Sequence, residues 1–167
     1  MNTSETSQTI REEIERLLPR LRRFARNLTR NRADADDLLQ GAVERALLHA
    51  GQWRRDTRLD GWMFKIVRNA WIDEVRSRGR RARIFAVAEA GEAVGTDPME
   101  QEATLLSVHA ALARLSEEQR MAVSLVLIEG LSYQEASEVL EIPIGTLTSR
   151  LARARETLQS LLEDFAP

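Results

Sequence analysis

The sequence predicts an all-α protein made of two small helical domains that a flexible linker joins. Two observations support this fold class. Of the 167 residues only 8 are glycine and 4 are proline, whereas alanine, leucine, arginine and glutamate, which favour helices, are abundant. Apolar residues also recur at helical spacing on both sides of an acidic stretch at 84–103, which has little periodicity and few large apolar side chains.

The first predicted domain, residues 10–83, opens with two helices. Apolar residues between positions 14 and 28 recur with i, i+3, i+4, i+7 spacing, which places them on one side of a helix. Polar residues at 31–35 predict a turn, and the acidic residues that follow suit the first turn of a second helix, where carboxylates oppose the helix dipole. The apolar pattern of this second helix runs to about Trp53.

A third helix of this domain is expected from Trp62 to about Arg78, after a loop of charged residues at 54–61. Asp60 is the expected N-cap, since its carboxylate can accept a hydrogen bond from a free N–H group of the first turn. Trp71 is expected in the core rather than stacked on a nucleic-acid base, because large aromatic side chains stabilise a fold chiefly by burial.

The second predicted domain, residues 104–165, begins with a helix over about 104–115. Ser116 and Gln119 then have the spacing of a capping box, in which each side chain satisfies a free N–H group at the start of a helix. An apolar run at 121–128 follows directly. The pattern predicts a second helix that starts after Ser116.

The segment 131–155 predicts two short helices around a tight turn. Ser132 and Glu135 repeat the capping-box spacing, and Pro143 ends the first helix because proline biases the preceding residue away from helical geometry. Leucines at helical spacing and several arginines follow. A polar and basic second helix is typical of the helix-turn-helix that enters the DNA major groove, although an ordinary amphipathic helix pair shares the pattern.

Charge is distributed unevenly along the chain. The formal net charge is only −2, but residues 54–83 contain ten basic and four acidic residues. Residues 84–118 contain one arginine and seven acidic residues. Because local fields steer association more than the total charge does, the small net charge is compatible with nucleic-acid binding by the segment 54–83.

Composition argues against several classes of function. Without cysteine the chain forms no disulfide and no thiolate metal site. Its longest apolar runs are too short to span a bilayer and no signal peptide opens the sequence, so we expect no membrane insertion and a cytoplasmic location. His49 and His109 lie on different predicted helices without a cluster of carboxylates. We therefore expect no catalytic residue, no metal and no cofactor, and hence no enzyme.

Three segments resemble bacterial sigma-70 family sigma factors of RNA polymerase, in the extracytoplasmic-function (ECF) group. Sigma region 2 has two successive helices that resemble DADDLLQGAVERAL at 34–47 and WMFKIVRNAWIDEVR at 62–76. Sigma region 4 resembles LSEEQRMAVSLVLIEGLSYQEASEVLEIPIGTLTSRLARARE at 115–156. The segments come in the family's order and cover nearly the whole chain apart from the linker and the first few residues. The resemblance implies an alternative sigma factor that binds core RNA polymerase and directs promoter-specific transcription initiation at −10 and −35 elements.

The resemblance also implies which residues of the first domain make contacts. Sigma factors dock the helix that matches 36–53 on the clamp of the largest polymerase subunit. The corresponding polymerase contacts are Asp36, Asp37, Leu38, Gln40, Val43 and Arg45. The loop at 54–61, with Asn69, matches the part that captures a flipped base of the −10 element. The implied −10 contacts are Arg54, Arg55, Arg58, Trp62, Lys65, Arg68, Asn69 and Arg76. Phosphate neutralisation is implied for Arg68, Arg76, Arg78, Arg80, Arg81 and Arg83.

In the second domain, the resemblance implies that the last helix enters the major groove at the −35 element. The implied −35 contacts are Thr146, Thr148, Ser149, Arg150, Ala152 and Arg153. Thr148 and Ala152 depart from the family, in which many members carry arginine or lysine at the first position and a larger residue at the second. The resemblance therefore implies the role of this helix but not the promoter sequence that it reads.

Core RNA polymerase and promoter DNA are the implied partners, and an anti-sigma factor is the implied inhibitor. Two alternatives stay open. A helix-turn-helix regulator that binds duplex DNA as a dimer would account for the second domain, but it would give no role to the tryptophan-rich helix of the first. A sigma mimic that binds a regulator without initiating transcription would lose promoter-reading residues, yet Asn69, Arg150 and Arg153 are present.

Overall fold

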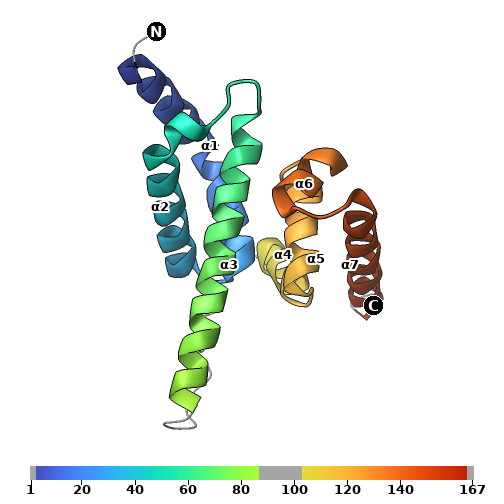
Figure 1. Cartoon of the computed structure of the whole chain (residues 1–167). Helices are drawn as coiled ribbons and strands as arrows, with labels where there is room; N and C mark the ends of the chain where they lie inside the picture. Colours follow the sequence, from blue (N-terminus) through green and yellow to red (C-terminus); the bar gives the residue numbers. More distant parts are fainter. Residues whose placement is uncertain (1–2, 87–102, 165–167) are drawn as a thin grey trace.

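The computed structural model describes residues 3–86 and 103–164, and within these ranges all regular structure is helical. The predicted all-α fold class is confirmed. The helices form two units, residues 3–86 and 103–164, which lie side by side (Figure 1). Among the described residues, no helix combines the length and the apolar character that a bilayer crossing requires.

The first helical unit, residues 3–86, is a bundle of three long helices. They are α1 (Thr3–Thr29), α2 (Arg32–Leu48) and α3 (Leu59–Ala86), and a 3-10 turn, η1 (Ala50–Gln52), follows α2. Phe24 of α1 and Phe64 of α3 meet edge to face in the core, with ring centroids 5.3 Å apart. Trp71 is also buried there, as the sequence predicts.

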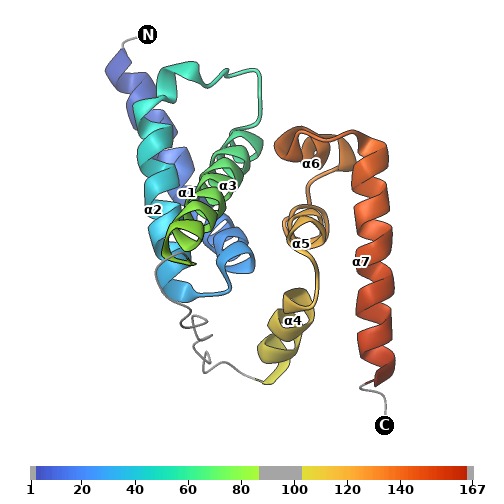
Figure 2. The same cartoon turned by 60° about the horizontal axis from the view of Figure 1, so that its bottom comes forward.

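The second helical unit, residues 103–164, contains the predicted helix-turn-helix. Its elements are α4 (Ala103–Ala113), α5 (Glu117–Val123), a π-helical turn η2 (Ser124–Ile128), α6 (Tyr133–Leu140) and α7 (Ile144–Asp164). Both predicted capping boxes form, at the starts of α5 and α6. Figure 1 and Figure 2 both show α5 and α6 between α3 and α7, so α7 lies on the side away from the first unit.

The predicted ends of α2 are wrong. Asn31, which the sequence places in a turn, is the N-cap of α2, because its side-chain oxygen accepts hydrogen bonds from the N–H groups of Ala33 and Asp34. The helix then ends at Leu48 rather than near Trp53. The apolar pattern continues past the helix because Trp53, after the 3-10 turn, still packs against the core.

The predicted ends of α3 are also wrong. The helix begins at Leu59, before the expected start at Trp62, so Asp60 lies in its first turn and is not an N-cap. Beyond Arg78 the helix continues to Ala86, and the Arg81 guanidinium donates a hydrogen bond to the hydroxyl of Ser77, at i, i+4 spacing, across the predicted end. The predicted linker, 84–103, therefore begins inside α3, and its residues 87–102 lie outside the described residues.

Candidate nucleic-acid and polymerase interfaces

One face of α3 collects most of the polar and cationic side chains of the helix that are predicted to contact the −10 element. These residues, spaced by three, four or seven positions so that they align along the helix, are Trp62, Lys65, Arg68, Asn69 and Arg76. The opposite face holds Met63, Phe64 and Val67, which are fully buried. Burial of the apolar face therefore orients the cationic face away from the core.

The remaining residues of the predicted −10 set, Arg54, Arg55 and Arg58, lie in the exposed segment between η1 and α3. Thr57 closes a tight turn in this segment, because its N–H and its hydroxyl donate to the carbonyl of Arg54 at 2.9 and 2.7 Å. The Arg54 guanidinium forms an ion pair with Asp56 at 2.7 Å. The turn places these arginines beside the start of α3.

Asp60 fixes this turn to the rest of the first unit. Its carboxylate accepts hydrogen bonds from Arg58 at 2.8 Å and from Arg20 of α1 at 3.1 Å, and a third from the N–H of Gly61 at 2.8 Å. Burial raises the pKa of Asp60, but these hydrogen bonds outweigh the burial and hold the pKa below its ordinary value. Asp60 therefore stays ionised and positions the guanidinium of Arg58.

The predicted polymerase contacts lie along α2, which forms a ridge between two grooves. One groove, of about 580 Å³, runs between α1 and α2 and is lined by Asp36, Gln40 and Val43. Arg22 of α1 reaches across it to Asp36, with the ion-pair atoms 3.4 Å apart. Both partners are about half exposed, so the pair lies at the surface of the groove.

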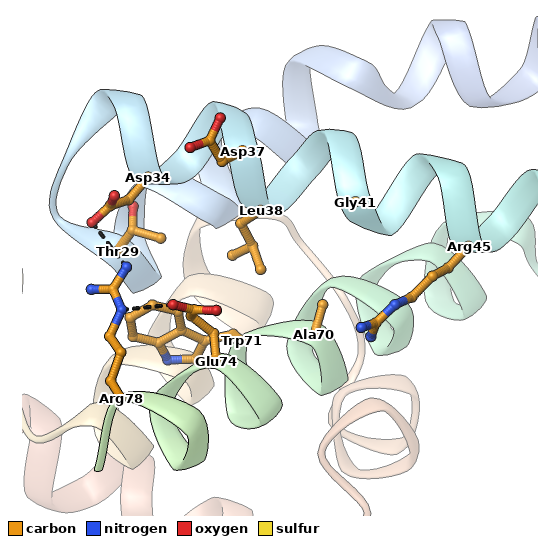
Figure 3. A pocket seen from close by; sticks show the side chains of 10 residues that line it. All are labelled: Thr29, Asp34, Asp37, Leu38, Gly41, Arg45, Ala70, Trp71, Glu74 and Arg78. Atoms are coloured by element: carbon orange, nitrogen blue, oxygen red, sulfur yellow. Dashed lines mark hydrogen bonds and ion pairs between the residues drawn. The ribbon is translucent and has the colours of Figure 1, made fainter. Parts of the chain in front are cut away.

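The second groove, of about 270 Å³, lies between α2 and α3 and is shown in Figure 3. It is lined by the other predicted polymerase contacts, Asp37, Leu38 and Arg45. Arg78 of α3 spans one end of it through an ion pair with Asp34 of α2, at 3.3 Å. The predicted contact residues thus occur on both flanks of the α2 ridge.

Most residues of the predicted −35 set lie on the exposed side of α7. Its opposite side, with Leu147, Leu151 and Ala154, is buried. The exposed residues of the set are Thr146, Thr148, Ser149, Ala152 and Arg153. The hydroxyls of Thr148 and Ser149 donate to backbone carbonyls of the preceding turn, at 2.9 and 3.0 Å.

Arg150 differs from the other residues of the predicted −35 set. Its guanidinium forms an ion pair with Glu118 of α5 at 3.3 Å, and its side chain is only 23% exposed. The pair ties this part of α7 to the start of α5. Arg153, one turn further along α7, is exposed.

A group of charged residues that no sequence pattern indicates joins the two units. The carboxylate of Glu129, whose side chain is fully buried at the end of η2, pairs with Arg20 and Arg23 of α1 at 3.3 and 2.7 Å. Three residues of the predicted −10 set also pair with the second unit: Arg58 with Glu135 at 2.6 Å, Lys65 with Glu141 at 2.8 Å and Arg68 with Glu141 at 3.1 Å. No pattern in a single sequence links residues so far apart in the chain.

The interfaces offer binding chemistry: guanidinium and ammonium groups suit phosphates, while an amide and an indole suit bases. Within the described residues, no three side chains of the types that ligate metals come together. His49 is exposed, and its Nδ1 lies 2.8 Å from the carbonyl oxygen of Arg45. The geometry therefore points to nucleic-acid and protein recognition.

Two family descriptions match the chain, one on each unit. Sigma-70 region 2 matches residues 14–81, and Sigma-70 region 4 matches residues 105–158. Among curated proteins, the ECF RNA polymerase sigma factor EcfG of Rhodopseudomonas palustris is 34% identical, over 96% of this chain and 92% of the relative. The ECF RNA polymerase sigma factor SigM of Mycobacterium tuberculosis is 38% identical, over 85% of this chain and 71% of the relative.

Solved structures show the same likeness. The sigma factor RpoE of Bartonella quintana, in complex with the anti-sigma factor NepR, superposes with a TM-score of 0.82 and 32% identity, over 93% of this chain and 98% of that chain. CnrH, in complex with the cytosolic domain of CnrY, superposes with a TM-score of 0.73 at 24% identity, over 98% of this chain and 96% of that chain. The second likeness shows the fold alone.

Proposed function

The chain belongs to the ECF group of the sigma-70 family, and we propose that it reads the −10 element with the cationic face of α3 and the −35 element with the exposed side of α7. As an alternative sigma factor it binds core RNA polymerase and directs promoter-specific transcription initiation. The observation that carries this function is the match of both sigma regions, in order, together with a relative 34% identical over 96% of the chain.

The −10 assignment is supported by the composition of the α3 face. Lys65 and Arg68 supply cations for the strand phosphates, a contact that is salt-dependent and independent of sequence. Asn69 is exposed beside them, and an amide can hydrogen-bond the edge of an unstacked base. Unstacking a base costs a few kcal/mol, which binding of the melted strand in the turn beside Asp60 would offset.

The −35 assignment is supported by the position and exposure of α7. Because the helix lies away from the first unit, its outer side is accessible to a duplex. We assign the main base contact to Arg153, since arginine is the commonest reader of guanine in the major groove. Ser149 and Ala152 flank it on the same exposed side.

We place the polymerase contact on the α2 ridge, where the two grooves give a partner helix a surface on either flank. We further propose the domain limits 10–83 and 104–165, with residues 84–103 as linker. The protein would then act in the cytoplasm, where polymerase works, as a regulatory subunit rather than as an enzyme. Since RpoE of Bartonella quintana is bound by the anti-sigma factor NepR, we propose that an anti-sigma factor also holds this chain.

The test of this function is run-off transcription with core polymerase on a library of genomic fragments. Addition of the full chain should yield transcripts from a limited set of promoters, and aligned start sites should reveal common −10 and −35 sequences. A chain that binds duplex DNA as a dimer without producing such transcripts would instead be a helix-turn-helix regulator. A chain that binds polymerase or a regulator but supports no transcript would be a sigma mimic.

A further inference from the structure

The DNA-reading face of α3 is in direct contact with the helix-turn-helix of the second unit. Glu141 pairs with Lys65 at 2.8 Å and with Arg68 at 3.1 Å, and Glu135 pairs with Arg58 at 2.6 Å. All three cations belong to the residues proposed to contact the −10 element, which together form the −10 surface: Arg54, Arg55, Arg58, Trp62, Lys65, Arg68, Asn69 and Arg76. Each of these three cations is therefore already paired with a carboxylate of the second unit.

Local structure gives both carboxylates fixed positions. Glu135 is the third residue of the α6 capping box, and its carboxylate accepts a hydrogen bond from the N–H of Ser132 at 2.8 Å. Glu141 ends α6 in a left-handed conformation, with φ of 55°. Hydrogen bonds from Lys65 and Arg68, with the charge of these groups, lower the pKa of Glu141. The hydrogen bond from the N–H of Ser132 likewise lowers the pKa of Glu135. Two ionised carboxylates therefore lie against Arg58 and the first turns of α3.

We propose that this contact is autoinhibitory: Glu135 and Glu141 occupy the cations of the −10 surface in the manner of phosphate groups and must leave before α3 binds promoter DNA. A carboxylate and a phosphate oxygen satisfy the same guanidinium and ammonium donors, so the two ligands compete directly. The proposal rests on the assignment of Lys65 and Arg68 to the −10 strand.

The spacing of the promoter elements supports the proposal. Elements centred near −10 and −35 are about 25 base pairs apart, or roughly 85 Å along a duplex with a rise of about 3.4 Å per base pair. In this structure the helix-turn-helix and the −10 surface contact each other through the pair of Lys65 and Glu141. The chain cannot read both elements in this arrangement, so the two units must separate for initiation.

A cavity between the units shows what the contact covers. It has a volume of about 430 Å³ and lies where the base-capturing turn meets α6. Its walls include Thr57, Gly61 and Trp62 from the first unit, and Leu131 and Val139 from the second. The helix-turn-helix therefore covers the cavity beside the turn at 54–61, where we propose that a flipped base binds.

The rest of the contact between the two units contains buried charged groups, which favour separation of the units. Glu129 is buried between Arg20 and Arg23, and each of these groups regains water when the units part. Arg120 of α5 is only 5% exposed, and its Nε has no hydrogen-bond partner among the described residues. Burial lowers the pKa of Arg120, and the charge of nearby Arg30 on the first unit adds to this effect. Such buried charge weakens an interface relative to an apolar one.

The experiment compares the full chain with the double variant Glu135→Gln, Glu141→Gln. Glutamine keeps the capping box of α6 but removes both negative charges. The control is Glu156→Gln, Glu163→Gln, which removes the same amount of charge. Both side chains are exposed on α7, outside the cavity between the units, and form no ion pair with the first unit within the described residues. The chain has no cysteine, so Glu12→Cys and Ser160→Cys place labels on one exposed site of each unit for distance measurements by fluorescence transfer.

The probe is a short single-stranded DNA of mixed sequence, titrated at about 50 and about 200 mM salt. We expect the double variant to bind it about five- to tenfold more tightly than the unaltered chain at the lower salt, with a longer distance between labels. The control should stay within about twofold in affinity and keep the original distance. An equal gain in the control, or no gain in either variant, overturns the proposal.

A third variant separates this proposal from the −10 assignment. Arg58→Ala, Lys65→Ala and Arg68→Ala, added to the double variant, remove every cation that Glu135 and Glu141 pair with and should abolish its gain in DNA affinity. If the label distance lengthens but the gain survives these substitutions, the cations do not read the strand, and the −10 assignment fails together with autoinhibition. Run-off transcription by the unaltered chain is independent of this outcome and tests the sigma function alone.

Discussion

Arg23 and Glu129 form a two-point ion pair across the boundary between the helical units. Nε of Arg23 lies 2.7 Å from Oε1 of Glu129, and Nη2 lies 2.8 Å from Oε2. Arg20, one turn earlier on α1, donates to the same carboxylate at 3.3 Å and to Asp60 at 3.1 Å. One chain of charged groups thereby connects η2, α1 and the first turn of α3.

The first prediction concerns Arg23. We expect Arg23→Ala to lower the free energy of unfolding by about 1–2 kcal/mol, because it removes two charge-assisted hydrogen bonds to a buried carboxylate. Arg23→Lys should restore less than half of this loss, since an ammonium group cannot form the parallel pair. Urea unfolding measures both. Arg22→Ala is the control, because the ion pair of Arg22 with Asp36 is half exposed and should contribute little to the free energy of unfolding. Equal losses from Arg23→Ala and Arg22→Ala would contradict the prediction.

The second prediction concerns the dependence of stability on pH at Asp60. The pKa of Asp60 in the folded chain lies below its ordinary value of 3.8, because hydrogen bonds from arginines outweigh the effect of burial. The ionised group therefore stabilises the fold at pH values above its ordinary pKa, and this contribution is lost as the pH falls through the folded pKa. Asp60→Asn should cost about 1–2 kcal/mol at neutral pH.

The cost of Asp60→Asn should shrink as the pH falls below the ordinary pKa of 3.8 and through the lower pKa of the folded chain, because the carboxylate of the unaltered chain then becomes protonated. Urea titrations at several pH values measure this difference. Asp56→Asn provides the control, since Asp56 and its partner Arg54 are both largely exposed. A cost at Asp60 that does not change with pH would mean that packing, not charge, sets the stability there.

The elements of the fold were predictable from local chemistry. The capping boxes at Ser116 and Ser132 fix where α5 and α6 begin, because the side chains and N–H groups involved lie within three residues of each other. Helix ends that depend on weaker signals were misplaced. Asn31 looks like a turn residue and is a cap, and Asp60 looks like a cap and is a buried ion-pair partner.

The contact between the units could not be predicted from the sequence. Glu129 follows an apolar run, and no local pattern shows that it pairs with Arg20 and Arg23, which are 109 and 106 residues away in the chain. Glu141 was recognisable as part of a helix break, but its left-handed φ and its pairing with Lys65 depend on tertiary packing. The predicted site residues were placed by resemblance and helix periodicity, whereas their partners required the structure.

The third prediction separates base capture from binding. Asn69→Ala should slow open-complex formation by at least about tenfold, because a flipped base loses hydrogen bonds that offset the cost of unstacking. Initial binding of the holoenzyme to duplex promoter should change little. Permanganate reactivity of promoter thymines follows opening, and a gel-shift titration follows binding. Ser77→Ala, also on α3 but outside the −10 set, is the control; equal losses in opening and binding would rule out base capture by Asn69.

The fourth prediction contrasts two arginines with different proposed tasks. Arg153→Ala should relax specificity at one position of the −35 element, with about 1–3 kcal/mol less discrimination, because a bidentate contact to a base edge is lost. Arg80→Ala, exposed near the end of α3, should weaken all promoters alike and lower the slope of log affinity against log salt by about one. Binding to a set of single-base −35 variants at several salt concentrations measures both effects side by side.

Each of the two substitutions serves as the control for the other. A uniform loss of affinity from Arg153→Ala would show that this residue contacts phosphate. A sequence-dependent loss from Arg80→Ala would show that α3 reads bases beyond the −10 element.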